Sequence, residues 1–139
     1  MPSDRPFRKM TDVWAEEAKC TRRQVGAVLF SPDGHTISTG YNGTPSGRPN
    51  CTEGGCPRGK LAYDEVPAGT DYNAVPCFGI HAEANALLRA GSRAVGCTIY
   101  INHEPCQQCR NLILSAGVVR VVYRDGPGGT WRSLEAEEL

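Results

Sequence analysis

The stretch HAEANALL, residues 81–88, and the stretch PCQQC, residues 105–109, decide how the rest of the chain is interpreted. His81 supplies an imidazole, and Cys106 and Cys109 supply two thiols, which are ligand types that Zn²⁺ prefers. Three protein ligands leave the fourth tetrahedral position of such an ion open for water. The two stretches therefore predict a metal site with room for chemistry.

Glu83 stands two residues after His81, and residues so spaced on an ideal helix do not share a face. A ligand role for both is awkward. We expect His81 to bind the metal at the start of a helix, and Glu83 to lie beneath the reacting water and move protons. The pattern H-x-E followed by P-C-x-x-C is typical of zinc-dependent nucleobase deaminases.

Two other interpretations of the cysteine pair stay open. The P-C-x-x-C pattern alone is also found in thioredoxin-like redox pairs, and with a distant His it also suits a non-catalytic, structural zinc module. The His-x-Glu pairing and the strand expected between the two stretches weigh against both. We expect His103, shortly before Pro105, to shape the pocket or contact the substrate rather than bind metal.

Apolar periodicity and Gly/Pro breakers divide the chain into helices and strands. The pattern predicts helices at residues 10–20 (beginning as early as Pro6), 81–90 and 106–116, and a short acidic helix in the tail, 131–139. It predicts strands at residues 26–30, 35–41, 98–101 and 118–123. The last strand–helix–strand unit should form a right-handed parallel crossover, which gives a mixed α/β sheet with helices on its faces.

The chain has 139 residues, a length that suits one domain over residues 1–139. Residues 42–76 lack periodicity and carry two cysteines, Cys51 and Cys56. A structureless connection of that length is uncommon in a compact domain, so a metal that orders it is one explanation.

The bulk composition limits the partners. Fifteen basic and fifteen acidic residues cancel, which argues against a dedicated nucleic-acid binder. We find no apolar run near the roughly 20 residues of a membrane span and no signal peptide, so a cytoplasmic location is expected. In a reducing compartment the seven cysteines are first interpreted as metal ligands or catalytic thiols.

From Cys20 to about Tyr123 the chain resembles the cytidine and deoxycytidylate deaminase superfamily. The motifs at 81–83 and 105–109 are shared across the superfamily. The stretches VGAV (25–28), GYNGTPSG (40–47) and HAEANA (81–86) look like the deoxycytidylate deaminase branch, which includes related competence-operon proteins. The resemblance implies a three-layer α/β/α fold with a mixed sheet of about five strands. It also implies zinc-dependent conversion of dCMP to dUMP with release of ammonia.

The resemblance further implies a homo-oligomer, a hexamer or a dimer, with dCTP as activator and dTTP as inhibitor. Residue by residue, it implies that Glu83 is the proton shuttle and that Asn42 hydrogen-bonds the sugar or the base. Arg22 and Arg23 are candidates for the phosphate, which guanidinium groups bind bidentately. It implies three zinc ligands, which are His81, Cys106 and Cys109.

Some members of this branch carry a second, structural zinc. By resemblance, its ligands here would be Cys20, Cys51, Cys56 and Cys77, which would tie down residues 42–76. The chain departs from the family pattern at Asn102, where Thr is usual, and in the Gly-rich stretch 124–129. Both border the expected pocket. Another substrate is therefore the alternative: CMP, a free nucleoside, a modified pyrimidine or a base in single-stranded nucleic acid.

Overall fold

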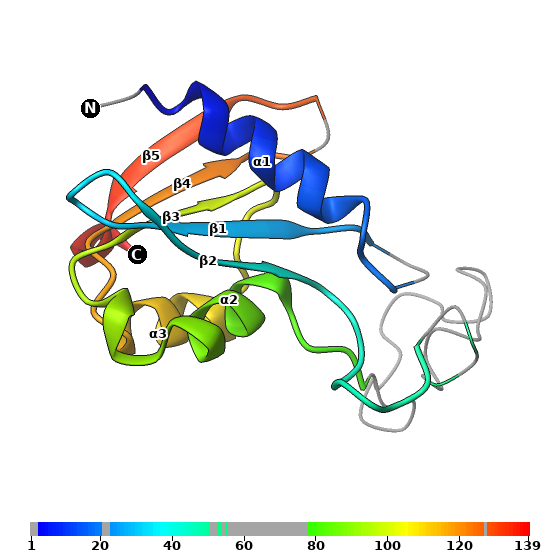
Figure 1. Cartoon of the computed structure of the whole chain (residues 1–139). Helices are drawn as coiled ribbons and strands as arrows, with labels where there is room; N and C mark the ends of the chain where they lie inside the picture. The colour runs from blue at the N-terminus through cyan, green and yellow to red at the C-terminus, as the bar shows by residue number, and fades with distance from the viewer. Residues whose placement is uncertain (1–2, 21–22, 51–52, 54, 56–77, 127) are drawn as a thin grey trace.

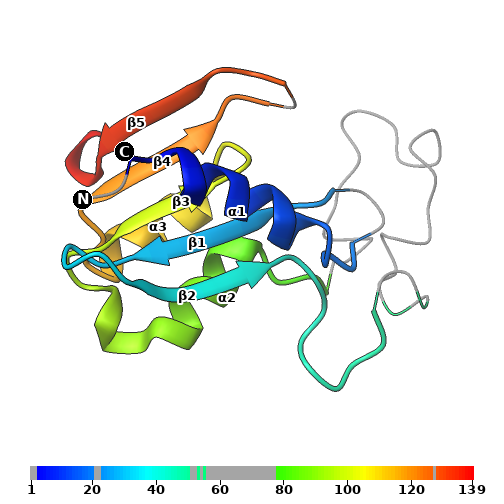
Figure 2. The ribbon, with the colours of Figure 1, turned by 45° about the horizontal axis from the view of Figure 1, so that its top comes forward.

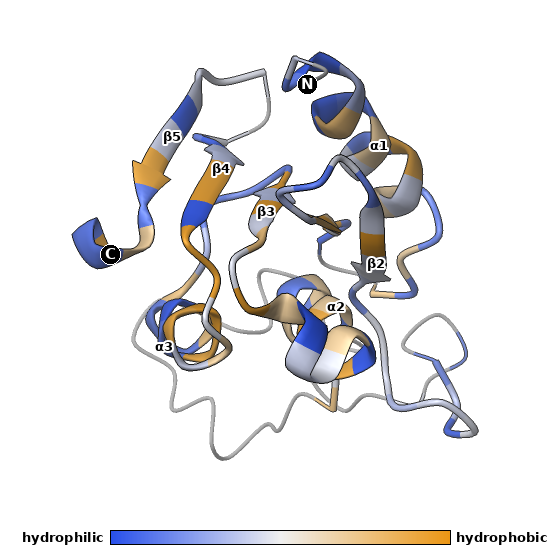
Figure 3. Cartoon of the chain, turned by 60° about the vertical axis from the view of Figure 1, so that its left-hand side comes forward, coloured by the Kyte–Doolittle hydropathy of each residue, from blue (hydrophilic) through white to orange (hydrophobic). Residues whose placement is uncertain are grey.

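Three layers make up the fold, with a five-stranded mixed sheet between one helix on one face and two on the other (Figures 1 and 3). The computed structural model describes residues 3–20, 23–50, 53, 55, 78–126 and 128–139. Within these residues, no helix is long and apolar enough to cross a membrane. The elements are α1 (Arg5–Ala15), β1 (Gly26–Phe30), β2 (Thr36–Tyr41), α2 (Ala82–Ala90), β3 (Thr98–Ile101), α3 (Gln107–Ser115), β4 (Arg120–Arg124) and β5 (Trp131–Glu135), with short 3₁₀ turns at Gly91–Ala94 and Ala136–Glu138.

The sheet order is β2-β1-β3-β4-β5. β1 is antiparallel to both β2 and β3, so β2 and β3 run in the same direction and end at the same edge of the sheet. β3 and β4 are parallel and α3 connects them, which confirms that the predicted crossover is parallel. The edge where β2 and β3 end is therefore where α2 and α3 can begin side by side.

β1 lies in the middle of both hydrophobic clusters, and all five of its residues are buried. Ala27 and Leu29 pack into the cluster beneath α2 and α3, whereas Val28 and Phe30 pack into the cluster beneath α1. A strand covered on both faces needs no polar alternation, which explains the continuous apolar run in its sequence.

Two glycines let helices lie directly on the sheet. A Cβ on Gly40 would collide with the backbone of α2 at Ala82, and a Cβ on Gly26 would collide with the backbone of α1 at Thr11. Each glycine thus allows a helix to approach a strand more closely than any other residue would. Gly40 therefore determines the distance between α2 and β2.

The tail differs from its prediction. Residues 131–135 form β5, antiparallel to β4 at the sheet edge, and only Ala136–Glu138 form a short 3₁₀ turn (Figure 2). The acidic helix predicted there was wrong. The guanidinium carbons of Arg8 and Arg124 lie 5.4 and 5.6 Å from the ring centroid of Trp131, so contacts with α1 and β4 favour the extended form.

Other boundaries shift less. The first helix occupies Arg5–Ala15 rather than residues 10–20, and Pro6 falls in its first turn, where proline is tolerated. The predicted strand bounds of β1 and β3 are confirmed. The four remaining predicted elements are each present within about two residues at either end.

Asp4 joins the start of α1 to the sheet. Its carboxylate accepts hydrogen bonds from the Tyr100 hydroxyl at 2.7 Å and from both terminal nitrogens of Arg120, at 3.1 and 2.8 Å. Chiefly because of the Arg120 hydrogen bond, the pKa of Asp4 lies below its usual value, although burial opposes that shift. One carboxylate thus connects α1, β3 and β4.

Candidate active site

Two helix starts meet at the edge where β2 and β3 end. His81 is the N-cap residue of α2, and Cys106 is the N-cap residue of α3, both in extended backbone conformations. His81 Nδ1 lies 3.2 Å from the Sγ of Cys109 and 3.6 Å from the Sγ of Cys106. The three ligand atoms lie within 4.8 Å of one another, so the structure brings the predicted zinc ligands together.

These distances fit a tetrahedral zinc ion. Typical Zn–N and Zn–S bonds of about 2.1 and 2.3 Å place the nitrogen and a sulfur about 3.6 Å apart in a tetrahedron. The observed separations of 3.2 and 3.6 Å need only small side-chain movements to reach that arrangement. One imidazole and two thiols are also the donor set expected for this ion, with a fourth position left for a reactant.

The thiol of Cys109 lies in the first turn of α3, where the partial positive charge of a helix N-terminus favours the thiolate form. Burial raises its pKa far above the ordinary value, and the nearby Glu83 carboxylate and Cys106 raise it further. Because burial outweighs the helix N-terminus, the thiolate form needs a cation next to it. A metal bound by these three residues would supply that cation.

Glu83 occupies the first turn of α2, and only 4% of its surface is exposed. A carboxylate so buried is costly unless it has partners, and buried acids are therefore uncommon in ordinary helix starts. Glu83 lines the same pocket as His81 and Cys106. The predicted acid–base residue is therefore beside the predicted ligands.

The catalytic pocket has a volume of about 230 Å³. It gathers residues from four separate parts of the chain, in front of β1, after β2, at the start of α2 and before α3. All three of the predicted substrate-contacting residues that the structure describes lie in its wall: Arg23, Asn42 and His103.

Comparison with known proteins identifies the family. The cytidine and deoxycytidylate deaminase zinc-binding region matches residues 1–125. The chain belongs to this family. The deoxycytidylate deaminase of Mycobacterium phage D29 is 42% identical over 123 residues, covering 86% of this chain and 92% of the phage protein.

Two longer proteins are also similar. The deoxycytidylate deaminase of Schizosaccharomyces pombe is 41% identical over 122 residues, and this chain spans 36% of its length. ComE operon protein 2 of Bacillus subtilis is 34% identical over 122 residues, and the chain spans 57% of it. These similarities confirm the branch of the superfamily that the sequence motifs predict.

A solved structure confirms the predicted fold. The crystal structure of dCMP deaminase from the cyanophage S-TIM5, in complex with dCMP and dUMP, aligns with a TM-score of 0.67 and 28% sequence identity. The alignment covers 90% of this chain and 84% of that one.

Asparagine side chains hold the backbone around the deaminase pocket. Asn42 Oδ1 accepts a hydrogen bond from the Val25 N–H at 2.8 Å, and its Nδ2 donates to the Arg23 carbonyl at 2.7 Å. Asn102 Oδ1 accepts from the Gly26 N–H at 2.9 Å. Oδ1 of Asn42 can accept one more hydrogen bond, and Nδ2 can donate one more. A substrate contact would use these two positions.

The remaining predicted site residues fall partly outside the described residues. Arg22, Cys51, Cys56 and Cys77 lie in segments that the structure does not describe, so the second zinc site is untested there. Cys20 is described and lines the catalytic pocket.

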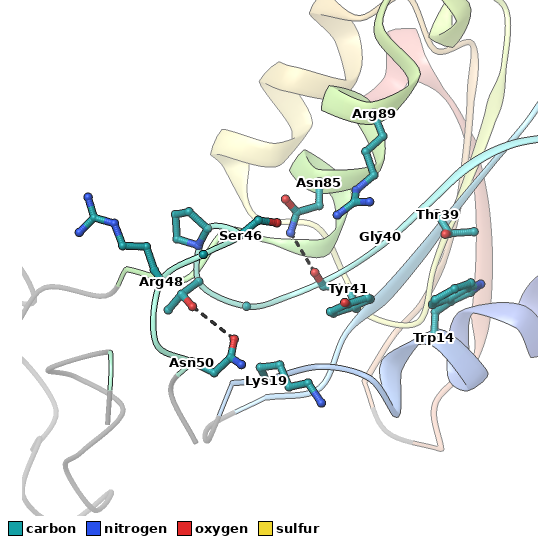
Figure 4. Close-up of a pocket in the computed structure, with 14 residues that line it drawn as sticks. Trp14, Lys19, Thr39, Gly40, Tyr41, Ser46, Arg48, Asn50, Asn85 and Arg89 are labelled. Atoms are coloured by element: carbon teal, nitrogen blue, oxygen red, sulfur yellow. Dashed lines mark hydrogen bonds between the residues drawn. The ribbon is translucent and has the colours of Figure 1, made fainter. Parts of the chain in front are cut away.

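A second cavity, of about 440 Å³, was not predicted (Figure 4). Trp14 of α1 and Tyr41 of β2 lie nearly parallel in its wall, with ring centroids 6.2 Å apart. Asn85 Nδ2 donates to the Tyr41 carbonyl at 2.9 Å. Among the described residues, three cationic side chains line the cavity: Lys19, Arg48 and Arg89. They are too far apart in the sequence for spacing alone to reveal their convergence.

Proposed function

We propose that this deaminase converts dCMP to dUMP with release of ammonia. The observation that carries the reaction type is the buried Glu83 carboxylate beside three converging zinc-ligand atoms. The substrate rests on the similarity to relatives named deoxycytidylate deaminase and to a structure named as a complex with dCMP and dUMP.

His81, Cys106 and Cys109 would hold the zinc ion. Zinc in such a site lowers the pKa of water to near ~7 and so makes a nucleophile available at neutral pH. Glu83 accepts one proton from the attacking water and delivers it to the ring nitrogen, and it then transfers the remaining proton of the new hydroxyl group to the departing amine. Its burial keeps bulk water from competing for these protons.

Substrate binding involves the pocket wall around this centre. Asn42 presents its remaining hydrogen-bonding positions to the sugar or the base, and His103 borders the same space. The exposed Arg23 gives the pocket a full positive charge for a phosphate, and Arg22 would add a second.

The test is ammonia release from cytosine, cytidine, deoxycytidine, CMP, dCMP and dCTP by zinc-loaded protein. We expect the highest kcat/KM with dCMP. Glu83→Gln should lower kcat by roughly 10³-fold or more while zinc content and the circular dichroism spectrum stay the same. A preference for another compound in this series would reject dCMP. Full activity of Glu83→Gln would reject the proposed reaction.

We further propose that the 440 Å³ cavity binds dCTP or dTTP as an effector. The cationic residues Lys19, Arg48 and Arg89 suit a polyphosphate, and the Trp14–Tyr41 pair offers an aromatic surface. Arg89→Gln should remove the response of activity to dCTP and dTTP, with dCMP turnover measured without effectors as the control. An unchanged dCTP response would reject this location.

We also propose that the protein is a homo-oligomer. Leu88 of α2 is 75% exposed, and Leu112 and Leu114 of α3 are 43% and 42% exposed, which leaves apolar side chains on the helical layer. Leu88→Glu should lower the mass measured by analytical ultracentrifugation from a dimer or hexamer toward a monomer. A wild-type monomer would contradict the proposal. For location we propose the cytoplasm, whose reducing conditions keep thiol ligands available.

A structural zinc bound by Cys20, Cys51, Cys56 and Cys77 is a separate proposal. It predicts two zinc ions per chain by metal analysis, one of which is lost in Cys20→Ser. A single zinc per wild-type chain would reject it.

A further inference from the structure

A charged pair lies at the rim of the catalytic pocket. Glu104 belongs to the pocket wall, and its side chain is 49% exposed. Its Oε1 lies 2.9 Å from Nη2 of Arg110 in α3. Arg110 follows the ligand Cys109 directly, and its side chain folds back over the segment that leads into Cys106.

The Arg110 guanidinium is held in place by a second contact. Its Nε donates to the Pro105 carbonyl at 3.1 Å, and its side chain is only 22% exposed. Two contacts to neighbouring residues fix the orientation of the planar group and direct one edge at Glu104. Arg110 is not among the described residues that line the pocket, so its charge reaches the substrate mainly through Glu104.

The charges in the pocket determine how tightly an anionic substrate binds. Glu83 is already a carboxylate inside the pocket, and Arg23 is the arginine in its described wall. A nucleoside monophosphate carries nearly two negative charges at neutral pH. An unpaired Glu104 would repel this phosphate and offset the attraction to Arg23, whereas a neutral nucleoside would be affected much less.

We propose that Arg110 is a specificity-determining residue that cancels the charge of Glu104 and so admits phosphorylated substrates. The inference rests on the proposed function, because only a phosphorylated substrate makes this charge matter. Arg110 acts through Glu104 and is a positioning residue, not a group that touches the reacting atoms.

The experiment compares KM and kcat for dCMP and deoxycytidine with zinc-loaded wild type, Arg110→Gln and the double variant Glu104→Gln/Arg110→Gln. In Arg110→Gln we expect KM for dCMP to rise about fivefold, with a much smaller change for deoxycytidine. Raising the salt from about 0.05 M to about 0.5 M should shrink the rise, because salt screens charges at an exposed rim. The double variant has the wild-type net charge at the rim and should recover the wild-type KM for dCMP.

The matched control is Arg132→Gln, which breaks an exposed Arg–carboxylate pair with Asp125, 3.0 Å long, on the tail strand. It should leave the ratio of the two KM values unchanged. Two results would overturn the inference. Equal losses of kcat/KM for dCMP and deoxycytidine in Arg110→Gln would show that Arg110 only supports the loop. A KM for dCMP that does not recover in the double variant would show that Arg110 supports the loop or binds the phosphate itself. Wild-type turnover of dCMP tests the proposed function separately, so turnover with an unchanged KM ratio in Arg110→Gln rejects this inference alone.

Discussion

Replacing Asp4 with Asn should measurably destabilise the fold, because this carboxylate joins α1 to two strands. The change removes the negative charge opposite Arg120 and leaves a single oxygen where two accept hydrogen bonds. It also weakens the partner of the Tyr100 hydroxyl, in a residue that is only 2% exposed. Hydrogen bonds to charged groups contribute about 1.5–3 kcal/mol each.

Solvent reduces this value, since the side chains of Asp4 and Arg120 are 25% and 32% exposed. We therefore expect Asp4→Asn to lower the free energy of unfolding by about 1.5 kcal/mol in total. With an unfolding entropy of about 2.1 cal/mol/K per residue, this corresponds to a fall in Tm of about 5 °C. Urea and thermal unfolding should be measured at equal zinc and protein concentrations, because bound metal and association also shift Tm.

The pH dependence gives a second measurement of the same interaction. Arg120 holds the pKa of Asp4 below its usual value in the folded state, so the charged form stabilises the fold. That stability is fully present above the unfolded pKa, near ~4, and is lost as pH falls through the lower folded pKa. The difference between wild type and Asp4→Asn should therefore stay constant from about pH 8 to about pH 5 and shrink in stronger acid.

The control is Asp125→Asn. Because its partner Arg132 is 56% exposed, this substitution should lower the free energy of unfolding by less than about 0.5 kcal/mol. The reasoning is refuted if Asp4→Asn costs no more than this control, or if its cost stays the same in acid.

Three further changes test the site and its supports. Cys106→Ser should release the zinc, abolish activity and lower Tm, which metal analysis and calorimetry would detect; retained zinc would contradict its role as a ligand. Gly40→Ala should force α2 away from β2 at Ala82 and cost more than about 2 kcal/mol, with weaker zinc binding by competition with a chelator. Asn102→Ala leaves the buried Gly26 N–H without its 2.9 Å partner and should cost about 1–3 kcal/mol in urea unfolding, so a neutral result would show that water replaces the amide.

The sequence predicted the parts of the fold that depend on local pattern. β1 was bounded correctly because it is a continuous apolar run, and β3 because it is a short run of β-branched and aromatic residues, as expected for strands covered on both faces. The zinc ligands were predicted together because His, Cys and Cys in these two motifs are a typical zinc donor set, and β2 and β3, which run in the same direction, bring the two helix starts to one edge of the sheet.

Features that depend on distant partners could not be predicted. The tail became β5 because it pairs with β4 and because Trp131 contacts Arg8 of α1, near the other end of the chain. The burial of the Cys109 thiol, which raises its pKa, also depends on how α3 packs and is not visible in the residue pattern. The 440 Å³ cavity likewise joins α1, β2 and α2, whose convergence follows only from the sheet order.

A pair of backbone hydrogen bonds closes the chain around the segment between Gly43 and Ile80. The Gly43 N–H donates to the Ile80 carbonyl at 3.2 Å, and the Ile80 N–H donates to the Gly43 carbonyl at 2.6 Å. The segment 44–79 therefore leaves and re-enters the domain at one point, directly before His81. Because the entropy of closing a loop grows only slowly with its length, the bridge holds His81 in register at a cost that depends little on the number of residues it encloses.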